Sequence, residues 1–132
     1  MNNKLFENGK IVVTCNNHIG GLLGEALLKY FLREELIKKI RGDYIITEKG
    51  WEELEIIGID IDKLRLHNNK NVNICSDSNY GIICEHMGSQ LGALLMERMF
   101  ELEWFKKKDR NIFELTLKGV TGLESLGIRI KH

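Results

Sequence analysis

Apolar residues recur every four positions in two long stretches of the chain, with polar residues between them. The first stripe is Ile19, Leu23, Leu27 and Phe31, and the second is Met87, Leu91, Leu95 and Met99. This spacing is typical of the buried face of an α-helix. We therefore predict a long helix over residues 18–34, capped by Asn16 or Asn17, and a second long helix around the later stripe.

A β-hairpin and a shorter helix are predicted after each long helix. The predicted strand pairs are 36–40 with 44–46, joined by Arg41-Gly42-Asp43, and 104–107 with 112–115. Thr47 and Thr116 stand where a shorter helix should begin, and Gly58 and Gly127 stand where it should end. The remaining predicted segments are a strand at 11–14, a short helix at 60–66 and a polar linker at 67–74.

The two stretches read as copies of one segment. Matched pairs include His18 with His86 and Gly24 with Gly92 at an offset of 68, and Thr47 with Thr116 at an offset of 69. Internal similarity at a fixed period indicates a repeated architecture. We predict a mostly helical chain with small β-hairpins (α+β), with a first repeat at 1–66, the linker at 67–74 and a second repeat at 75–132. Two such copies can pack about a pseudo-twofold axis, as in a symmetric dimer.

Glycines inside the predicted long helices need a reason, because each costs about 1 kcal/mol relative to alanine in a helix interior. They stand four positions apart in matched pairs, Gly20 with Gly24 and Gly88 with Gly92. Each pair leaves a flat strip on one face of its helix. We expect a close approach at these strips, and packing of the two long helices is favoured over contact with a flat ligand.

Composition and charge narrow the classes of partner. The 132 residues carry zero formal net charge, so no overall field draws the chain onto nucleic acid or an anionic membrane. The first ten residues lack the apolar core of a signal peptide, and no apolar run approaches the length of a membrane span. Three cysteines without a disulfide-rich pattern predict a reducing, cytoplasmic environment.

Cysteines and histidines gather just before both predicted long helices: Cys15, His18, Cys75, Cys84 and His86. A helix N-terminus favours thiolate and neutral imidazole, the forms that bind metal. If the pseudo-twofold joins the two helix starts, two cysteines and two histidines would surround one zinc-like ion. Local hydrogen bonding by the histidines, with the cysteines buried as small apolar residues, is the commoner arrangement, and a redox or soft-ligand role is a third interpretation.

Basic residues mark the tips of both predicted hairpins: Lys38, Lys39 and Arg41 in the first, and Lys106, Lys107, Lys108 and Arg110 in the second. Such a hairpin could contact the phosphates of a nucleic acid, as a β-hairpin wing does. Acidic residues on the long helices, among them Glu25 and Glu97, oppose groove binding, and solvated lysine-rich turns are the more common explanation. No paired carboxylates, nucleophile–base set or phosphate loop stands out, so the sequence predicts a binding protein and not an enzyme.

Short motifs in a fixed order connect these features. They are Thr14-Cys15-Asn16-Asn17-His18, Ile46-Thr47-Glu48-Lys49-Gly50, Ile57-Gly58-Ile59-Asp60-Ile61-Asp62-Lys63-Leu64, Cys75-Ser76-Asp77, Leu91-Gly92-Ala93-Leu94-Leu95 and Leu115-Thr116-Leu117-Lys118-Gly119. In order and spacing, residues 14–128 resemble the C-terminal region of long ArsR-family transcriptional regulators. The resemblance implies two tandem winged-helix-like repeats and a cytoplasmic location. It departs at Ser78, where those regulators carry tryptophan, and we expect their N-terminal DNA-reading domain to be absent here.

The favoured hypothesis is therefore a regulator-type sensory or assembly module. It would bind a small effector, a metal ion or a redox signal at the interface of the repeats, and a zinc-like ion or a haem are the candidate cofactors. One alternative is a tandem winged-helix DNA-binding protein that uses the basic hairpin tips. A second is a structural interaction domain whose partner, a regulator chain, carries the reader. For assembly of the chain with itself, a homodimer is the candidate.

Overall fold

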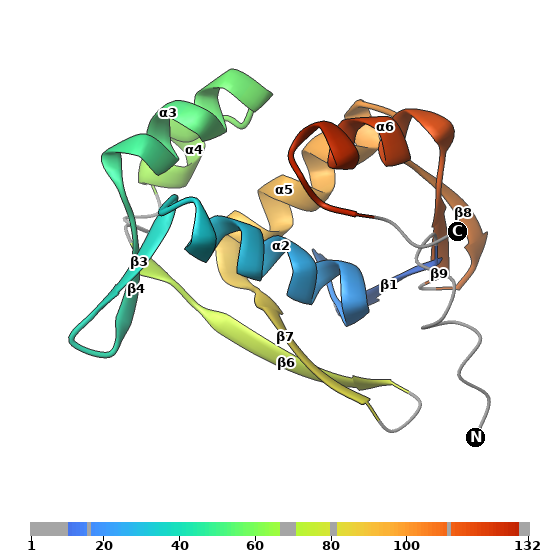
Figure 1. Cartoon of the computed structure of the whole chain (residues 1–132), viewed down its shortest axis with the longest axis horizontal. Coiled ribbons are helices and arrows are strands. Elements are labelled where there is room, and N and C mark those ends of the chain that lie inside the picture. The colour runs from blue at the N-terminus through green and yellow to red at the C-terminus, as the bar shows by residue number, and fades with distance from the viewer. Residues whose placement is uncertain (1–10, 16, 67–70, 80–81, 111, 130–132) are drawn as a thin grey trace.

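The computed structural model describes residues 11–15, 17–66, 71–79, 82–110 and 112–129. They form a mixed α/β structure with small antiparallel sheets (Figure 1). Two long helices cross the middle of the molecule, and a hairpin with a shorter helix lies toward either end. Strands take a larger share than the mostly helical prediction allows, because the segments before both long helices are strands.

Within the described residues, the first half contains four strands and three helices. In chain order they are β1 (Ile11–Cys15), β2 (His18–Ile19), α2 (Gly21–Arg33), β3 (Ile37–Ile40), β4 (Asp43–Ile46), α3 (Glu48–Ile57) and α4 (Ile61–Leu66). The predicted hairpin, the helix after it and the short helix at 60–66 are thereby confirmed within one or two residues.

In the described part of the second half there are five strands and two helices. They are β5 (Asn71–Val72), β6 (Ile74–Asn79), β7 (Ile82–Met87), α5 (Ser89–Glu101), β8 (Phe105–Asp109), β9 (Ile112–Leu115) and α6 (Leu117–Ser125). Within the described ranges, no helix combines the length and the apolar character needed to cross a membrane.

The halves exchange strands. β1 pairs antiparallel with β9 of the second half, where Val12 lies opposite Phe113, and β5 pairs antiparallel with β4 of the first half, where Val72 lies opposite Tyr44. The prediction of a linker at 67–74 is therefore wrong for its second part, which forms β5 and the start of β6. Residues 67–70 lie outside the described ranges.

Both long helices begin later than the sequence pattern suggests. α2 has Gly20 at its N-cap and α5 has Gly88, and neither helix has a side-chain cap. The predicted cap by Asn17 is wrong, because the chain stays in the sheet until each glycine: Gly20 N donates to Val13 O at 3.0 Å and Gly88 N to Asn73 O at 2.8 Å. Gly20 and Gly88 are thus helix caps, where they cost little, and not interior glycines. Asn16 lies outside the described residues.

The shorter helices begin and end as predicted. The Thr47 hydroxyl accepts from Gly50 N at 2.9 Å and donates to Glu35 O at 2.6 Å. The Thr116 hydroxyl makes the matching pair of bonds, to Gly119 N at 3.1 Å and Glu103 O at 2.6 Å. Each threonine therefore caps its own helix and ties it to the end of the preceding long helix. Gly58 and Gly127 follow these helices with φ of 93° and 92°, values that favour glycine.

The core lies at the seam between the halves. All eight residues of the two apolar stripes are buried, although the first of each stripe lies in a strand. α2 packs mainly against β7 of the second half, and α5 packs against β2 of the first half. Each long helix therefore covers the hairpin that precedes the other one, so the two halves share one hydrophobic core.

Candidate metal centre

Two antiparallel hairpins position the cysteines and histidines. In β1 and β2, Cys15 lies directly opposite His18, and in β6 and β7, Cys75 lies directly opposite His86. Residues that face each other across an antiparallel pair have neighbouring side chains. Each hairpin therefore presents one thiol beside one imidazole, and each long helix follows directly after its hairpin.

The seam brings the two Cys/His pairs together. His18 Nδ1 lies 3.0 Å from His86 Nε2, and Cys15 Sγ lies 3.8 Å from Cys75 Sγ. One ligand atom from each of the four residues can be chosen so that all four lie within 4.8 Å of one another. Two residues come from each half, so the complete set exists only when the halves are packed.

These distances fit the ligand sphere of zinc. Zn–S bonds of about 2.3 Å in a tetrahedral site place two sulfurs about 3.8 Å apart, and Zn–N bonds of about 2.0–2.1 Å place two nitrogens about 3.3–3.4 Å apart. The sulfur pair already has the required separation. The imidazoles, which are hydrogen-bonded to each other, would need to part by only a few tenths of an ångström.

Burial differs between the two kinds of ligand. His86 is fully buried and His18 is 7% exposed, whereas Cys15 and Cys75 are partly exposed. The two imidazole rings lie with their centroids 5.0 Å apart and their planes tilted by 40°. The histidines thus form the floor of the site, and the thiols form its entrance.

The interior glycines of the long helices support this floor. A Cβ built on Gly24 would lie 2.8 Å from His86 Cβ, and one built on Gly92 would lie 2.9 Å from His18 Cβ. The predicted close approach is therefore present at Gly24 and Gly92, but the neighbour is the histidine of the other half and not the opposite long helix. Neither position leaves room for a larger residue.

Cys84, a fifth candidate ligand in the sequence, is placed elsewhere. Its side chain is 1% exposed on β7, and its backbone lies opposite Asp77. It does not belong to the group of four whose ligand atoms converge in the described part of the chain. The sequence pattern also hid the equivalence of Cys75 with Cys15, because the second hairpin is longer: eleven positions separate Cys75 from His86, but three separate Cys15 from His18.

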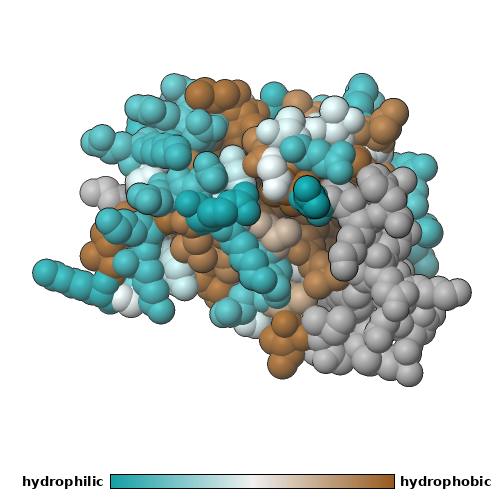
Figure 2. Space-filling model, viewed as in Figure 1, coloured by the Kyte–Doolittle hydropathy of each residue, from teal (hydrophilic) through white to brown (hydrophobic). Residues whose placement is uncertain are grey.

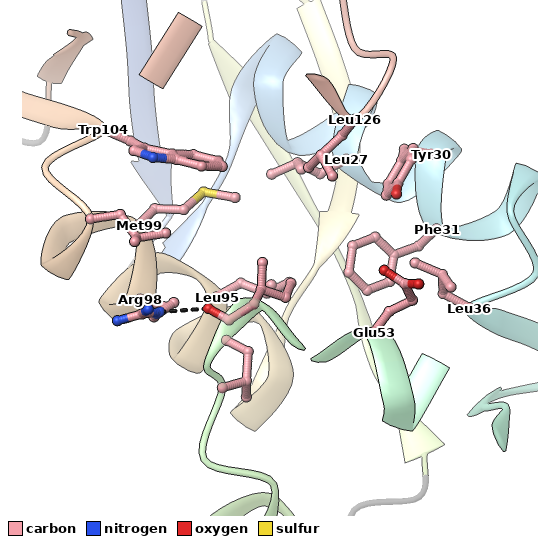
Figure 3. Close-up of a pocket in the computed structure, with 13 residues that line it drawn as sticks. Leu27, Tyr30, Phe31, Leu36, Glu53, Leu95, Arg98, Met99, Trp104 and Leu126 are labelled. Carbon is pink, nitrogen blue, oxygen red and sulfur yellow. Dashed lines mark hydrogen bonds between the residues drawn. The ribbon is translucent and has the colours of Figure 1, made fainter. Parts of the chain in front are cut away.

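An apolar cavity of about 30 Å³ lies between the C-terminal halves of α2 and α5 (Figure 3). Leu27, Phe31 and Met99 line it, with Glu53 at one edge. Burial and the nearby Glu53 carboxylate raise the pKa of Tyr30, which also lines the cavity. The volume admits about two water-sized groups, so it is a packing gap and not a formed effector pocket.

The two basic hairpin tips lie toward opposite ends of the molecule. Lys38, Lys39 and Arg41 are exposed on the β3–β4 hairpin, and hydrophilic side chains cover this end of the molecule in Figure 2. The β8–β9 hairpin lies toward the other end. There Lys106 Nζ lies 3.3 Å from the carboxylate of Glu114 and Lys108 Nζ lies 3.9 Å from it, so part of the positive charge is paired.

Comparison with known proteins points to the class of transcriptional regulators. The chain is 24% identical over 119 residues to the uncharacterized HTH-type transcriptional regulator YdfF of Bacillus subtilis (strain 168). The aligned part is 89% of this chain and 52% of YdfF, so the chain spans about half the length of that relative. No family model and no solved structure matches. These findings support a regulator-like relationship, and membership of the ArsR family stays a prediction.

Proposed function

We propose that this chain is the sensory or assembly module of a transcriptional regulator and that it binds one zinc-like divalent ion. The ligands are Cys15, His18, Cys75 and His86. The observation that carries the proposal is the convergence of these four side chains from two hairpins that are far apart in the sequence. The similarity to a regulator supports the biological context.

The chemistry of the four donors favours a small, borderline-soft cation. Two thiolates with two imidazoles form one of the common structural zinc sites, whereas calcium and magnesium prefer oxygen ligands. A haem, the other candidate cofactor, needs space for a porphyrin around its iron. Ligand atoms that all lie within 4.8 Å, above two buried histidines, leave room for an ion alone.

The proposed ion joins the two halves. We propose that the halves are tandem winged-helix-like repeats related by a pseudo-twofold axis, and that the ion lies on this axis. The exchange of β1 and β5 between the halves supports this arrangement, as do the matched surroundings of Gly24 and Gly92. Since each half supplies one Cys and one His, binding stabilises the packed arrangement over any separated one.

Metal analysis and cobalt substitution test the proposal. Protein purified without added metal or chelator should contain about one zinc per chain. After zinc removal, Co²⁺ should bind with the visible absorption bands of a tetrahedral site and the near-ultraviolet charge-transfer band of cobalt–thiolate bonds. His18→Ala and His86→Ala should each abolish or strongly weaken this spectrum.

Cys84→Ala is the matched control. Cys84 lies on β7, the strand that carries His86, but it is outside the ligand group. This variant should keep full metal content and an unchanged cobalt spectrum. The proposal fails if the wild-type protein stays metal-free in the presence of excess zinc. It also fails if the cobalt spectrum survives in His86→Ala, or if loss of Cys84 removes it.

In this proposal the chain binds a metal ion and does not catalyse a reaction. DNA is read by a helix-turn-helix domain on the same polypeptide or on a partner chain.

Direct DNA binding through the hairpins is the second candidate function. It is favoured by one observation, the exposure of the basic residues on both tips. The pairing of Lys106 and Lys108 with Glu114 weighs against it, because paired charges release fewer counterions from DNA.

A further inference from the structure

We infer that Cys15 and Cys75 form an intrachain disulfide on oxidation and that this bond replaces the metal ion. The inference rests on the proposed function in one respect: the two sulfur atoms that would bind the metal ion are the ones that would form the disulfide. The disulfide itself needs no metal. It would make the seam between the halves responsive to peroxide-type oxidants as well as to metal supply.

The two thiols lie next to each other before any oxidation. Their Sγ atoms are 3.8 Å apart, and a disulfide bond of about 2.05 Å requires them to approach by about 1.8 Å. Rotation about the Cα–Cβ bonds of two partly exposed side chains can supply such a movement.

Solvent exposure distinguishes Cys15 and Cys75 from Cys84, the third cysteine. Cys15 and Cys75 are partly exposed at the entrance of the site, so a small oxidant can reach them. Cys84 is buried, so it is shielded from the oxidant. The ligand group of the metal centre does not include it. Susceptibility of a thiol to oxidation follows its accessibility.

The chemical step balances with hydrogen peroxide as the oxidant. One thiol sulfur attacks the peroxide and becomes a sulfenic acid, with release of one water. The second sulfur then displaces the hydroxyl group, which leaves as a second water when the thiol proton joins it. Two thiols lose two protons and two electrons, and one peroxide is reduced to two waters.

Formation of this bond excludes the ion. A disulfide sulfur is a poor metal ligand because binding requires the thiolate, so only His18 and His86 would remain. The ion would leave, and a covalent bond between β1 and β6 would hold the seam in its place. Conversely, a bound ion occupies both sulfurs and should slow the oxidation.

Thiol counting on the metal-free protein tests the disulfide. After chelation and treatment with hydrogen peroxide, the chain should lose two of its three free thiols and two hydrogens in mass. Cleavage before Asp77 separates Cys75 from Cys84, and peptide mapping without reductant should then show Cys15 joined to Cys75. The Cys84→Ala variant should form the same bond, and Cys15→Ser should not.

Several results would overturn the inference. They are retention of all three thiols, separate over-oxidation of Cys15 and Cys75, a bond that involves Cys84, or a bond between two chains. Repeating the treatment on zinc-loaded protein examines the metal site separately. Slower oxidation with release of zinc supports both proposals, whereas disulfide formation at the same rate with and without zinc supports the disulfide and counts against the proposed ligand set.

Discussion

Replacement of Gly24 by alanine should loosen both the core and the metal centre, although alanine is the better helix former. A Cβ at this position would lie 2.3 Å from Ile19 O and 2.8 Å from His86 Cβ. The first atom belongs to the backbone of β2, which is held in its hairpin by pairing with β1. The clash therefore cannot be relieved by a simple rotation of a side chain.

The expected change in the free energy of unfolding combines two opposing contributions. Overpacking a well-filled core costs about 1–3 kcal/mol, and contact with backbone places this case near the upper end. Alanine in place of glycine inside a helix returns about 1 kcal/mol. We expect a net loss of about 2 kcal/mol in the free energy of unfolding, which lowers the Tm of a chain of this size by roughly 6–12 °C. Gly92→Ala should behave alike, since its Cβ would meet Met87 O at 2.2 Å and His18 Cβ at 2.9 Å.

Urea denaturation and zinc titration of the same variants provide the assay. Gly42→Ala is the glycine control, because nothing lies within 4 Å of its Cβ and the positive φ of 86° is its only penalty. It should lose about 1 kcal/mol from backbone strain and keep its zinc affinity, whereas Gly24→Ala should lose both stability and affinity. If Gly24→Ala is as stable as the wild type and binds zinc equally well, α2 does not pack closely against His86 at this position.

Two further predictions concern the shorter helices and the hairpin tips. Thr47→Ala and Thr116→Ala should each lower the free energy of unfolding by about 1 kcal/mol through loss of a helix cap, and stability equal to the wild type in urea would contradict the capping role. If the basic tips bind DNA, duplex binding should weaken steeply with salt and fall further in Lys38→Glu and Lys107→Glu. A gel-shift assay at low salt that shows no binding by the wild type would exclude this role for the tips.

The proposed metal site draws its ligands from both halves of the chain, so one half alone could not form it. Each hairpin contributes only one thiol and one imidazole to the converging group, too few ligands for a closed metal site. Packing of the halves doubles this set because α2 rests on β7 and α5 rests on β2. The exchange of strands then makes separation of the halves costly, since it would break the pairing of β1 with β9 and of β5 with β4.

Local signals in the sequence predicted much of the fold. The four-residue spacing of apolar side chains marked α2 and α5, and Thr47 and Thr116 marked the starts of α3 and α6. These features depend on interactions between residues three or four apart, so short stretches of sequence contain them. The strand predicted at 11–14 is present as β1, but β2, β6 and β7 were missed. Glycine caps, unlike Asn or Thr caps, give no distinctive signal in an apolar region, so the late start of each long helix was not visible.

By itself the sequence determined the repeat, the apolar faces and the presence of thiols and imidazoles before both long helices. The tertiary structure alone decided that Cys15 faces Cys75, that Cys84 lies apart and that each histidine rests against a glycine of the other half. These relations join residues that are about sixty positions apart, and strand register and packing at the seam create them. A local pattern of residue types carries no information about register across such a distance, because a slip of one position turns every side chain to the opposite face.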